Sequence, residues 1–181
     1  YTYSTMYSVR PSFFYHLPKT AGTSYIYDQE KTTVVIRPDR TVRHNPIWWW
    51  EQQHKIEHTL ENTNSIVRNP YDRAVSLWLY CSKLWEVHCT LKEFYTTHNF
   101  VDKYNTEREL CWNTKSSMKD HLTNSKGKIG ATVVKLENIH ISSRLNANNS
   151  RIPYSNLINV NDKSMLRDIF SEDFKEFDYE I

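Results

Sequence analysis

The chain alternates short apolar runs with longer stretches in which apolar residues recur every three or four positions. The short runs predict strands at residues 12–16, 32–36, 64–67 and 131–136. The longer stretches predict helices at residues 47–60, 70–84, 91–98, 106–122, 162–170 and 172–177. Strands that alternate with helices indicate an α/β fold with a mostly parallel sheet in one domain, which binds ligands at the carboxyl ends of its strands.

The clearest helix signal lies at residues 70–84. Pro70 suits a first helical position, where its missing N–H costs nothing. Ala74, Leu77, Trp78 and Cys81 follow at the spacing of one buried face. Elsewhere, the pattern predicts a turn at residues 126–130 and a polar loop at residues 146–153.

Composition limits the classes of function. With 181 residues, of which 39% are hydrophobic and 24% charged, the chain suits one globular domain with a full core. A net charge of +2 is too small to indicate nucleic acid as a partner, but it suits a pocket for an anionic small molecule. No apolar run has transmembrane length, and the three cysteines lack the spacing of a disulfide framework or a zinc knuckle.

A first candidate anion site follows the first expected strand. The loop begins at Pro18, and Thr23 is expected to cap a short helix. Its candidate binding residues are Lys19, Thr20, Ala21, Gly22, Thr23 and Ser24. Backbone N–H groups at such a helix start can bind a phosphate. The lysine comes first rather than last, so this is not a Walker A loop. An ordinary strand–loop–helix connection remains an alternative.

A second candidate anion site follows the expected strand at residues 64–67. Arg68 ends that strand, Ser76 lies within the next helix, and Arg73 is about one turn before Ser76. Arg68 can bind a phosphate through two parallel hydrogen bonds, and Ser76 adds a hydroxyl. Alternatively, Arg68 pairs with Asp72 and Ser76 bonds back to its own helix. Two such sites in one small chain suggest a ligand with two separate phosphate groups.

Together, these segments resemble the sulfotransferases that use 3′-phosphoadenosine 5′-phosphosulfate (PAPS), in particular their family-2-like, carbohydrate-type branch. In that family, the loop that corresponds to Pro18–Ser24 binds the 5′-phosphosulfate, and the segment that corresponds to Val67–Ser76 binds the 3′-phosphate. The residues around Glu137-Asn138 and the ending Asp173–Tyr179 resemble the family more weakly. The resemblance implies a P-loop-like sulfotransferase fold.

The resemblance also implies a reaction: a sulfuryl group moves in line from PAPS to an acceptor hydroxyl, and PAP is the product. Lys19 would stabilise the charge on the leaving phosphate. His44 is our candidate for the general base, because carbohydrate-type relatives carry a catalytic histidine in a comparable place. His16 and Glu51 are its rivals, and Arg151 would contact a phosphate from a closing loop.

The acceptor is left open between a sugar, a phenol and a protein tyrosine. Trp48, Trp49 and Trp50 cannot all be buried on one helix face, so at least one is expected to face a pocket or solvent, where a flat ring suits a sugar or a phenol. Golgi relatives carry an N-terminal anchor that is not visible here. A short chain of this kind is expected to be cytoplasmic, and the Golgi lumen stays open if an anchor has been removed.

Three alternatives compete with this interpretation. A small-molecule phosphotransferase would also use two anion sites, although a Walker A loop is missing. His54-Lys55-Ile56-Glu57-His58 fits the H-x-x-E-H pattern of a zinc peptidase, in which both histidines share a helix face, and Glu137 could supply a third ligand. A binding module for PAP or a sugar, without catalysis, is the third.

Overall fold

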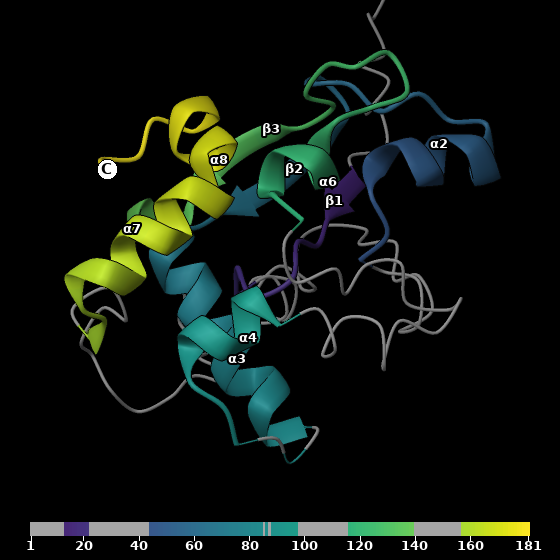
Figure 1. Ribbon diagram of the computed structural model, residues 1–181. Coiled ribbons are helices and arrows are strands. Elements are labelled where there is room, and N and C mark those ends of the chain that lie inside the picture. The colour runs from purple at the N-terminus through teal and green to yellow at the C-terminus, as the bar shows by residue number, and fades with distance from the viewer. Residues whose placement is uncertain (1–12, 22–43, 85, 87, 98–115, 140–156) are drawn as a thin grey trace, which may run out of the picture.

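The computed structural model describes residues 13–21, 44–84, 86, 88–97, 116–139 and 157–181 (Figure 1). Several sequence-based expectations lie outside these residues. They are the strand at residues 32–36, the helix start with Gly22, Thr23 and Ser24, and the loop that carries Arg151.

Three parallel strands form the described sheet, in the order β1-β2-β3. They are β1 (Phe13–Tyr15), β2 (Thr63–Val67) and β3 (Thr132–Lys135), and a short 3₁₀ helix, η2 (Leu136–Asn138), follows β3. Tyr15 pairs with Ser65, and Ser65 pairs with Val133, so the carboxyl ends of all three strands lie at one edge of the sheet. The expected α/β class with a parallel sheet is therefore confirmed for the described part of the chain.

One hydrophobic cluster joins the sheet to α2 (Ile47–His54) and α6 (Met118–Leu122). Tyr15 and Val67 from the strands pack there with Ile47, Met118 and Leu122 from the helices. Gly130 lies at this junction: a Cβ atom on it would come within 3.2 Å of both the His58 carbonyl oxygen and an Ile47 methyl carbon. The turn before β3 therefore packs closely against the segment after α2.

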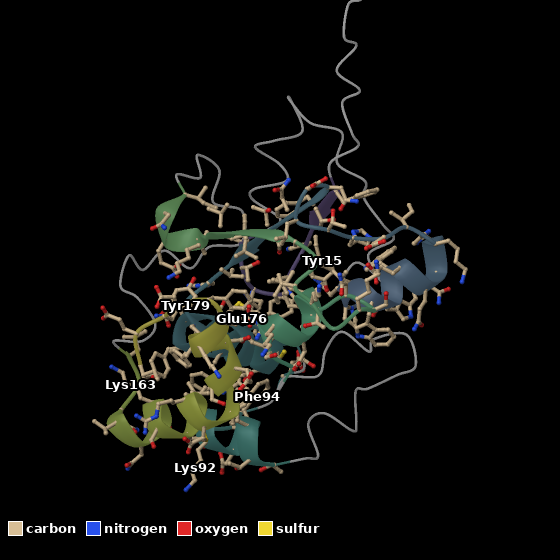
Figure 2. All side chains as sticks on the ribbon, turned by 90° about the horizontal axis from the view of Figure 1, so that it is seen from above. Tyr15, Lys92, Phe94, Lys163, Glu176 and Tyr179 are labelled. Carbon is tan, nitrogen blue, oxygen red and sulfur yellow. The ribbon has the colours of Figure 1, made fainter. Side chains whose placement is uncertain are left out.

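A second cluster holds α3 (Pro70–Leu84), α4 (Leu91–Thr96), α7 (Val160–Ile169) and α8 (Ser171–Glu176) together. Figure 1 shows these helices grouped on one side of the sheet, and Figure 2 labels Phe94 of α4 next to the C-terminal helices. Ala74, Leu77 and Cys81 are buried and Trp78 packs against the cluster, so both the bounds and the buried face predicted for α3 are confirmed.

Two predicted helices are shorter than their apolar spacing indicated. Helix α2 ends at His54 because Lys55 turns into the left-handed region at φ 56° and its N–H donates to the Glu51 carbonyl. The prediction that the helix continues to residue 60 is wrong. Helix α6 begins only at Met118, because Ser117 and Asp120 form a capping box. The start predicted at residue 106 lies outside the described residues, but residues 116 and 117 are not helical.

None of the helices in the described residues is both long and apolar enough to cross a membrane.

Candidate anion-binding site

The carboxyl edge of the sheet gathers the charged residues of three segments. Lys19 follows β1, Arg68 follows β2 directly, and Glu137 follows β3 within η2. Since the strands are parallel and adjacent, these residues lie at the same edge even though 118 positions separate the first from the last. In α/β proteins this edge is the usual place for a ligand.

Lys19 and Arg68, the leading cations of the two sequence motifs, meet at this edge. The Arg68 Nη1 atom donates to the Lys19 carbonyl oxygen at 3.4 Å. Burial of the ammonium group, and secondly the charge of Arg68, hold the pKa of Lys19 below its usual range. Two neighbouring, partly buried cations repel each other, so this arrangement favours an anion between or beside them.

The first loop adopts an unusual backbone. Lys19 and Ala21 have φ angles of 65° and 60°. These angles lie in the left-handed region, which residues other than glycine rarely adopt. Thr20 between them is buried, and its hydroxyl donates to the Leu17 carbonyl at 3.1 Å. The hydroxyl that we expected to contact a phosphate therefore closes the loop here.

Arg73 holds the start of this loop through a hydrogen bond to its backbone. Its guanidinium is buried, with Nε donating to the Pro18 carbonyl at 3.3 Å and Nη1 donating to the Ser116 carbonyl at 3.1 Å. A buried charge is stable only when its hydrogen-bonding groups find partners, and these carbonyls provide two of them. Arg73 thus ties helix α3 to the start of the first anion loop, a structural role that its sequence position did not reveal.

Helix α3 brings the Tyr80 ring to Lys19. Ser76 is partly buried on this helix, and Tyr80 is four residues further along, on the same face. The Lys19 Nζ atom lies 4.3 Å from the centroid of the Tyr80 ring, in cation–π contact. Our sequence analysis missed Tyr80, although its spacing from Ser76 was the signal that could have found it.

His44 is placed beside the end of β1. Its side chain is only 5% exposed, and Nδ1 lies 2.8 Å from the His16 carbonyl oxygen. A carbonyl accepts but cannot donate, so Nδ1 carries the proton, and in the neutral ring Nε2 is the basic nitrogen. The two imidazole rings are in edge contact, with centroids 4.7 Å apart. His44 therefore packs against His16, and His16 lies three residues before Lys19 in the chain.

The Tyr15 side chain holds this histidine segment to the sheet. Its hydroxyl donates to the Asn45 carbonyl at 2.6 Å and lies 3.2 Å from both the His44 carbonyl oxygen and the Nδ1 atom of His121. His121 is buried, and its Nε2 atom has no hydrogen-bond partner. Burial, then the charges of Arg73 and His44, lowers the pKa of His121 to about 3, so this ring stays neutral.

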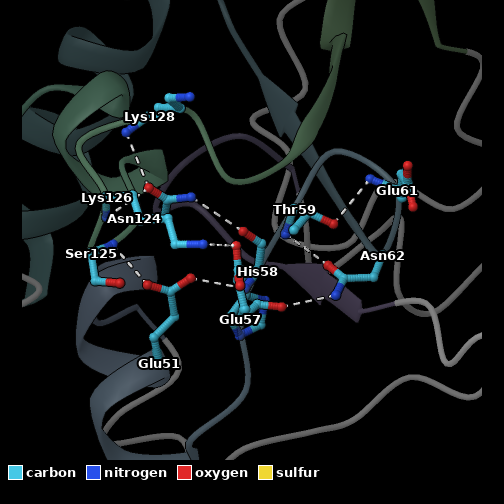
Figure 3. A network of polar contacts seen from close by, with 10 residues as sticks. All are labelled: Glu51, Glu57, His58, Thr59, Glu61, Asn62, Asn124, Ser125, Lys126 and Lys128. Carbon is cyan, nitrogen blue, oxygen red and sulfur yellow. Dashed lines mark hydrogen bonds and ion pairs between the residues drawn. The ribbon is translucent and has the colours of Figure 1, made fainter.

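Glu51, the alternative base, has a different environment. Its Oε1 atom accepts the His58 N–H at 2.8 Å and its Oε2 atom accepts the Ser125 N–H at 2.7 Å (Figure 3). Burial raises the pKa of this carboxyl, but the hydrogen bonds from Ser125 and His58 outweigh it, so the pKa lies below its usual range. A carboxylate with both oxygens occupied and a lowered pKa is a structural anchor and a weak base.

The H-x-x-E-H segment does not form the helix face that its pattern requires. His54 is the last residue of α2, whereas His58 lies beyond the helix and its Nδ1 atom is 2.8 Å from the Thr63 hydroxyl. Glu57 forms an exposed ion pair with Lys126 (Figure 3). Glu137 lies at the opposite edge of the sheet from Thr63. Within the described residues, no three His, Cys, Asp or Glu side chains are grouped to hold a metal ion.

The three tryptophans divide as expected. Trp48 is 37% exposed, while Trp50 packs against the cluster around the sheet and stacks on His54. Trp48, at the start of α2 and four residues after His44, is the most exposed of the three.

Glu137 and Asp173 hold backbone N–H groups at the starts of helices α3 and α6. Glu137 accepts the Asn69 N–H through Oε1 at 2.8 Å and the Tyr179 hydroxyl through Oε2 at 3.0 Å. Asp173, fully buried, accepts the N–H groups of Met118 and Lys119 at the start of α6. Both carboxylates therefore fix helix starts.

We compared the chain with protein-family models, with curated proteins and with solved structures, and none of the three comparisons gave a match.

Proposed function

We propose that this protein is a sulfotransferase that moves a sulfuryl group from PAPS to the hydroxyl of an acceptor. The observation that carries the proposal is the contact between Lys19 and Arg68. Each belongs to a different anion motif, and each comes from the end of a different strand. Because β1 and β2 are adjacent and parallel, both motifs place their cations at the carboxyl edge of the sheet, the usual place for a ligand in α/β proteins.

The electrostatics of the site support a ligand with separated negative charges. Lys19 is buried enough for its pKa to be lowered, and Arg68 adds a second positive charge next to it. A bound anion relieves both effects, because it replaces lost hydration and cancels the repulsion. Within this proposal, the Lys19 loop holds the 5′-phosphosulfate, and Arg68 with Ser76 holds the 3′-phosphate.

The fold is consistent with the same assignment. A parallel sheet whose first strand runs into an anion loop is the arrangement that a P-loop-like sulfotransferase fold requires. The residues that fit PAPS are Lys19 and the loop backbone on one side, and Arg68 and Ser76 on the other. PAPS would supply an activated sulfuryl group with PAP as its leaving group.

His44 and Lys19 would then perform the proton and charge steps. As the acceptor oxygen forms its bond to sulfur and the bond from sulfur to the bridging oxygen breaks, His44 takes the acceptor proton at Nε2. The hydrogen bond from Nδ1 to the His16 carbonyl keeps Nε2 in its basic form. Lys19 stabilises the negative charge that develops on the bridging oxygen.

The acceptor side of the site starts at His44 and Trp48. An exposed indole ring close to the base in sequence suits a sugar ring or a phenol, including a tyrosine side chain. The proposal therefore leaves the acceptor as a hydroxyl on one of these three classes.

The direct test is to measure transfer from ³⁵S-labelled PAPS to a panel of sugars, phenols and tyrosine peptides. Calorimetry with PAP and AMP is done on the same preparation. We expect label transfer to one acceptor class and much tighter binding of PAP, because AMP lacks the 3′-phosphate. Equal affinity for PAP and AMP would contradict the proposal.

A further inference from the structure

Glu137 connects three segments that are distant in the chain. Its two carboxylate oxygens accept hydrogen bonds from the Asn69 N–H at 2.8 Å and from the Tyr179 hydroxyl at 3.0 Å. The carboxylate thus joins η2 after β3, the residue that follows Arg68, and the C-terminal tail, which we define as residues 177–181.

Asn69 lies between the end of β2 and the start of helix α3. Its side-chain Oδ1 accepts the Tyr71 N–H at 2.9 Å, and its carbonyl accepts the Arg73 N–H at 2.9 Å. The N–H that Glu137 holds belongs to the peptide bond between Arg68 and Asn69. Fixing this peptide plane fixes the backbone from which the Arg68 side chain starts.

The C-terminal tail is folded back onto the same edge. The Tyr179 N–H donates to the Phe174 carbonyl at 3.0 Å, and the Lys135 ammonium donates to the Asp178 carbonyl at 2.6 Å. The Lys135 Nζ atom also lies 4.5 Å from the centroid of the Tyr179 ring. Figure 2 labels Tyr179 just beyond helix α8. Lys135 at the end of β3 and Glu137 in η2 therefore hold the tail through Asp178 and Tyr179.

The charges nearby agree with this arrangement. Burial, then the negative charge of Glu137, raises the pKa of Tyr179, and the charge of Arg68 opposes the shift. Tyr179 therefore remains a protonated donor to Glu137, and Arg68 is close enough to act on it.

We propose that Glu137 and Tyr179 form a clamp that positions Arg68 for the second anionic group of the ligand, so that the C-terminal tail is part of the anion site. Glu137 is a positioning residue in this inference, because it touches the backbone next to Arg68 and not the ligand. The inference rests on the proposed function for the identity of that group, a 3′-phosphate.

Two substitutions at Glu137 separate its charge from its geometry. Glu137→Gln removes the negative charge but keeps an oxygen for the Asn69 N–H and an amide for Tyr179. It should leave PAP affinity unchanged or raise it up to about threefold, since a negative charge near Arg68 is gone. Glu137→Ala removes both hydrogen bonds and should lower PAP affinity about tenfold relative to Glu137→Gln, with AMP affinity almost unchanged.

Tyr179→Phe removes only the bond between the tail and Glu137, so we expect a loss of PAP affinity of about threefold. Glu57→Ala is the matched control, because Glu57 is an exposed glutamate in an ion pair at the opposite edge of the sheet. Thermal unfolding of each variant checks that it is folded. If Glu137→Ala has the same ratio of PAP to AMP affinity as Glu137→Gln, the clamp does not position Arg68.

Amide hydrogen exchange provides a test that needs no ligand. In Glu137→Ala the Asn69 amide should exchange about tenfold faster, while the amides of α7 keep their rates. An unchanged Asn69 rate would overturn the inference even if PAP binds as proposed. Conversely, faster exchange in a protein that binds PAP and AMP equally would contradict the proposed function, and the role of the clamp in 3′-phosphate binding with it.

Discussion

The guanidinium of Arg68 donates to the carbonyl oxygen of Lys19 at 3.4 Å across 49 positions of sequence. One contact thus joins the loop after β1 to the start of helix α3, and it brings together the cations that each motif supplies. The Lys19 carbonyl accepts a hydrogen bond from Arg68, and the Lys19 ammonium lies over the face of the Tyr80 ring. The predictions below follow from this site and from the buried residues behind it.

Arg68→Ala should weaken PAP binding by about 2–4 kcal/mol, because the phosphate loses a charged, hydrogen-bonded partner. AMP binding should change much less, since AMP lacks the group that Arg68 holds. Calorimetry with both nucleotides measures the two effects. Arg167→Ala is the control, because Arg167 is an exposed arginine on α7. Similar losses for PAP and AMP would show that Arg68 does not recognise the 3′-phosphate.

PAP affinity should fall as the pH rises into the alkaline range. The pKa of Lys19 is lowered, chiefly by burial and then by Arg68, so this ammonium loses its proton earlier than an ordinary lysine. The charged form binds the anion, and its loss therefore weakens binding as the pH passes through the lowered pKa. Lys19→Arg keeps its charge throughout this range and should remove the dependence. A wild-type affinity with the same pH dependence as that of Lys19→Arg would contradict this prediction.

Lys19→Ala should lower kcat by about 10²–10³-fold, the scale for one preorganised electrostatic group. His44→Ala should lower kcat by about 10²–10⁴-fold, the scale for a general base, while PAP affinity barely changes. The wild-type rate should rise with pH as a histidine loses its proton, and this rise should vanish in His44→Ala. His88→Ala, at an exposed histidine, is the control. If turnover and its pH profile survive in His44→Ala, His16 is the next base to test.

Transfer should survive EDTA. The positive charge at the site comes from Lys19 and Arg68, and the first loop lacks the lysine position of a Walker A motif. Incubation with EDTA, followed by the transfer assay with and without added Mg²⁺, measures this directly. Activity that is lost and returns with Mg²⁺ would favour the phosphotransferase alternative, whereas return with Zn²⁺ would favour a role for His54 and His58.

Acid should destabilise the protein partly through His121. Its pKa is about 3 in the folded state and about 6.5 in an unfolded chain, so the unfolded state binds an extra proton between these values. The free energy of unfolding therefore decreases as the pH falls below about 6.5, by up to about 1.4 kcal/mol per pH unit. The free energy of unfolding can be measured by denaturant unfolding at several pH values between about 4 and 7. It should change less steeply with pH in His121→Gln than in wild type. Equal slopes would mean that another group takes up the proton.

The sequence by itself determined the local elements and the residue types at the site. Pro70 and the spacing from Ala74 to Cys81 were sufficient for the bounds of α3, because a proline start and a period of 3.6 residues are local properties. The parallel direction of β1, β2 and β3 follows from strands separated by helices. Lys19 and Arg68 were visible because they follow strands directly.

Local patterns alone gave the wrong ends for two helices. The apolar spacing continues beyond His54, but Lys55 adopts a left-handed conformation, and this backbone choice has no strong sequence signal at a lysine. At α6 the signal was present, because Ser117 and Asp120 have the spacing of a capping box. At this position the side-chain cap, and not the apolar spacing, sets the start of the helix.

Only the tertiary structure decided which of these residues act together. The His16 carbonyl selects the His44 tautomer. The backbone N–H groups of His58 and of the distant Ser125 make Glu51 a structural anchor rather than a base. Glu137 contacts Asn69 only because β2 and β3 are neighbours in the sheet. Such contacts depend on strand order and register, which bring residues 68 positions apart to within hydrogen-bond distance, and no local pattern in the chain encodes them.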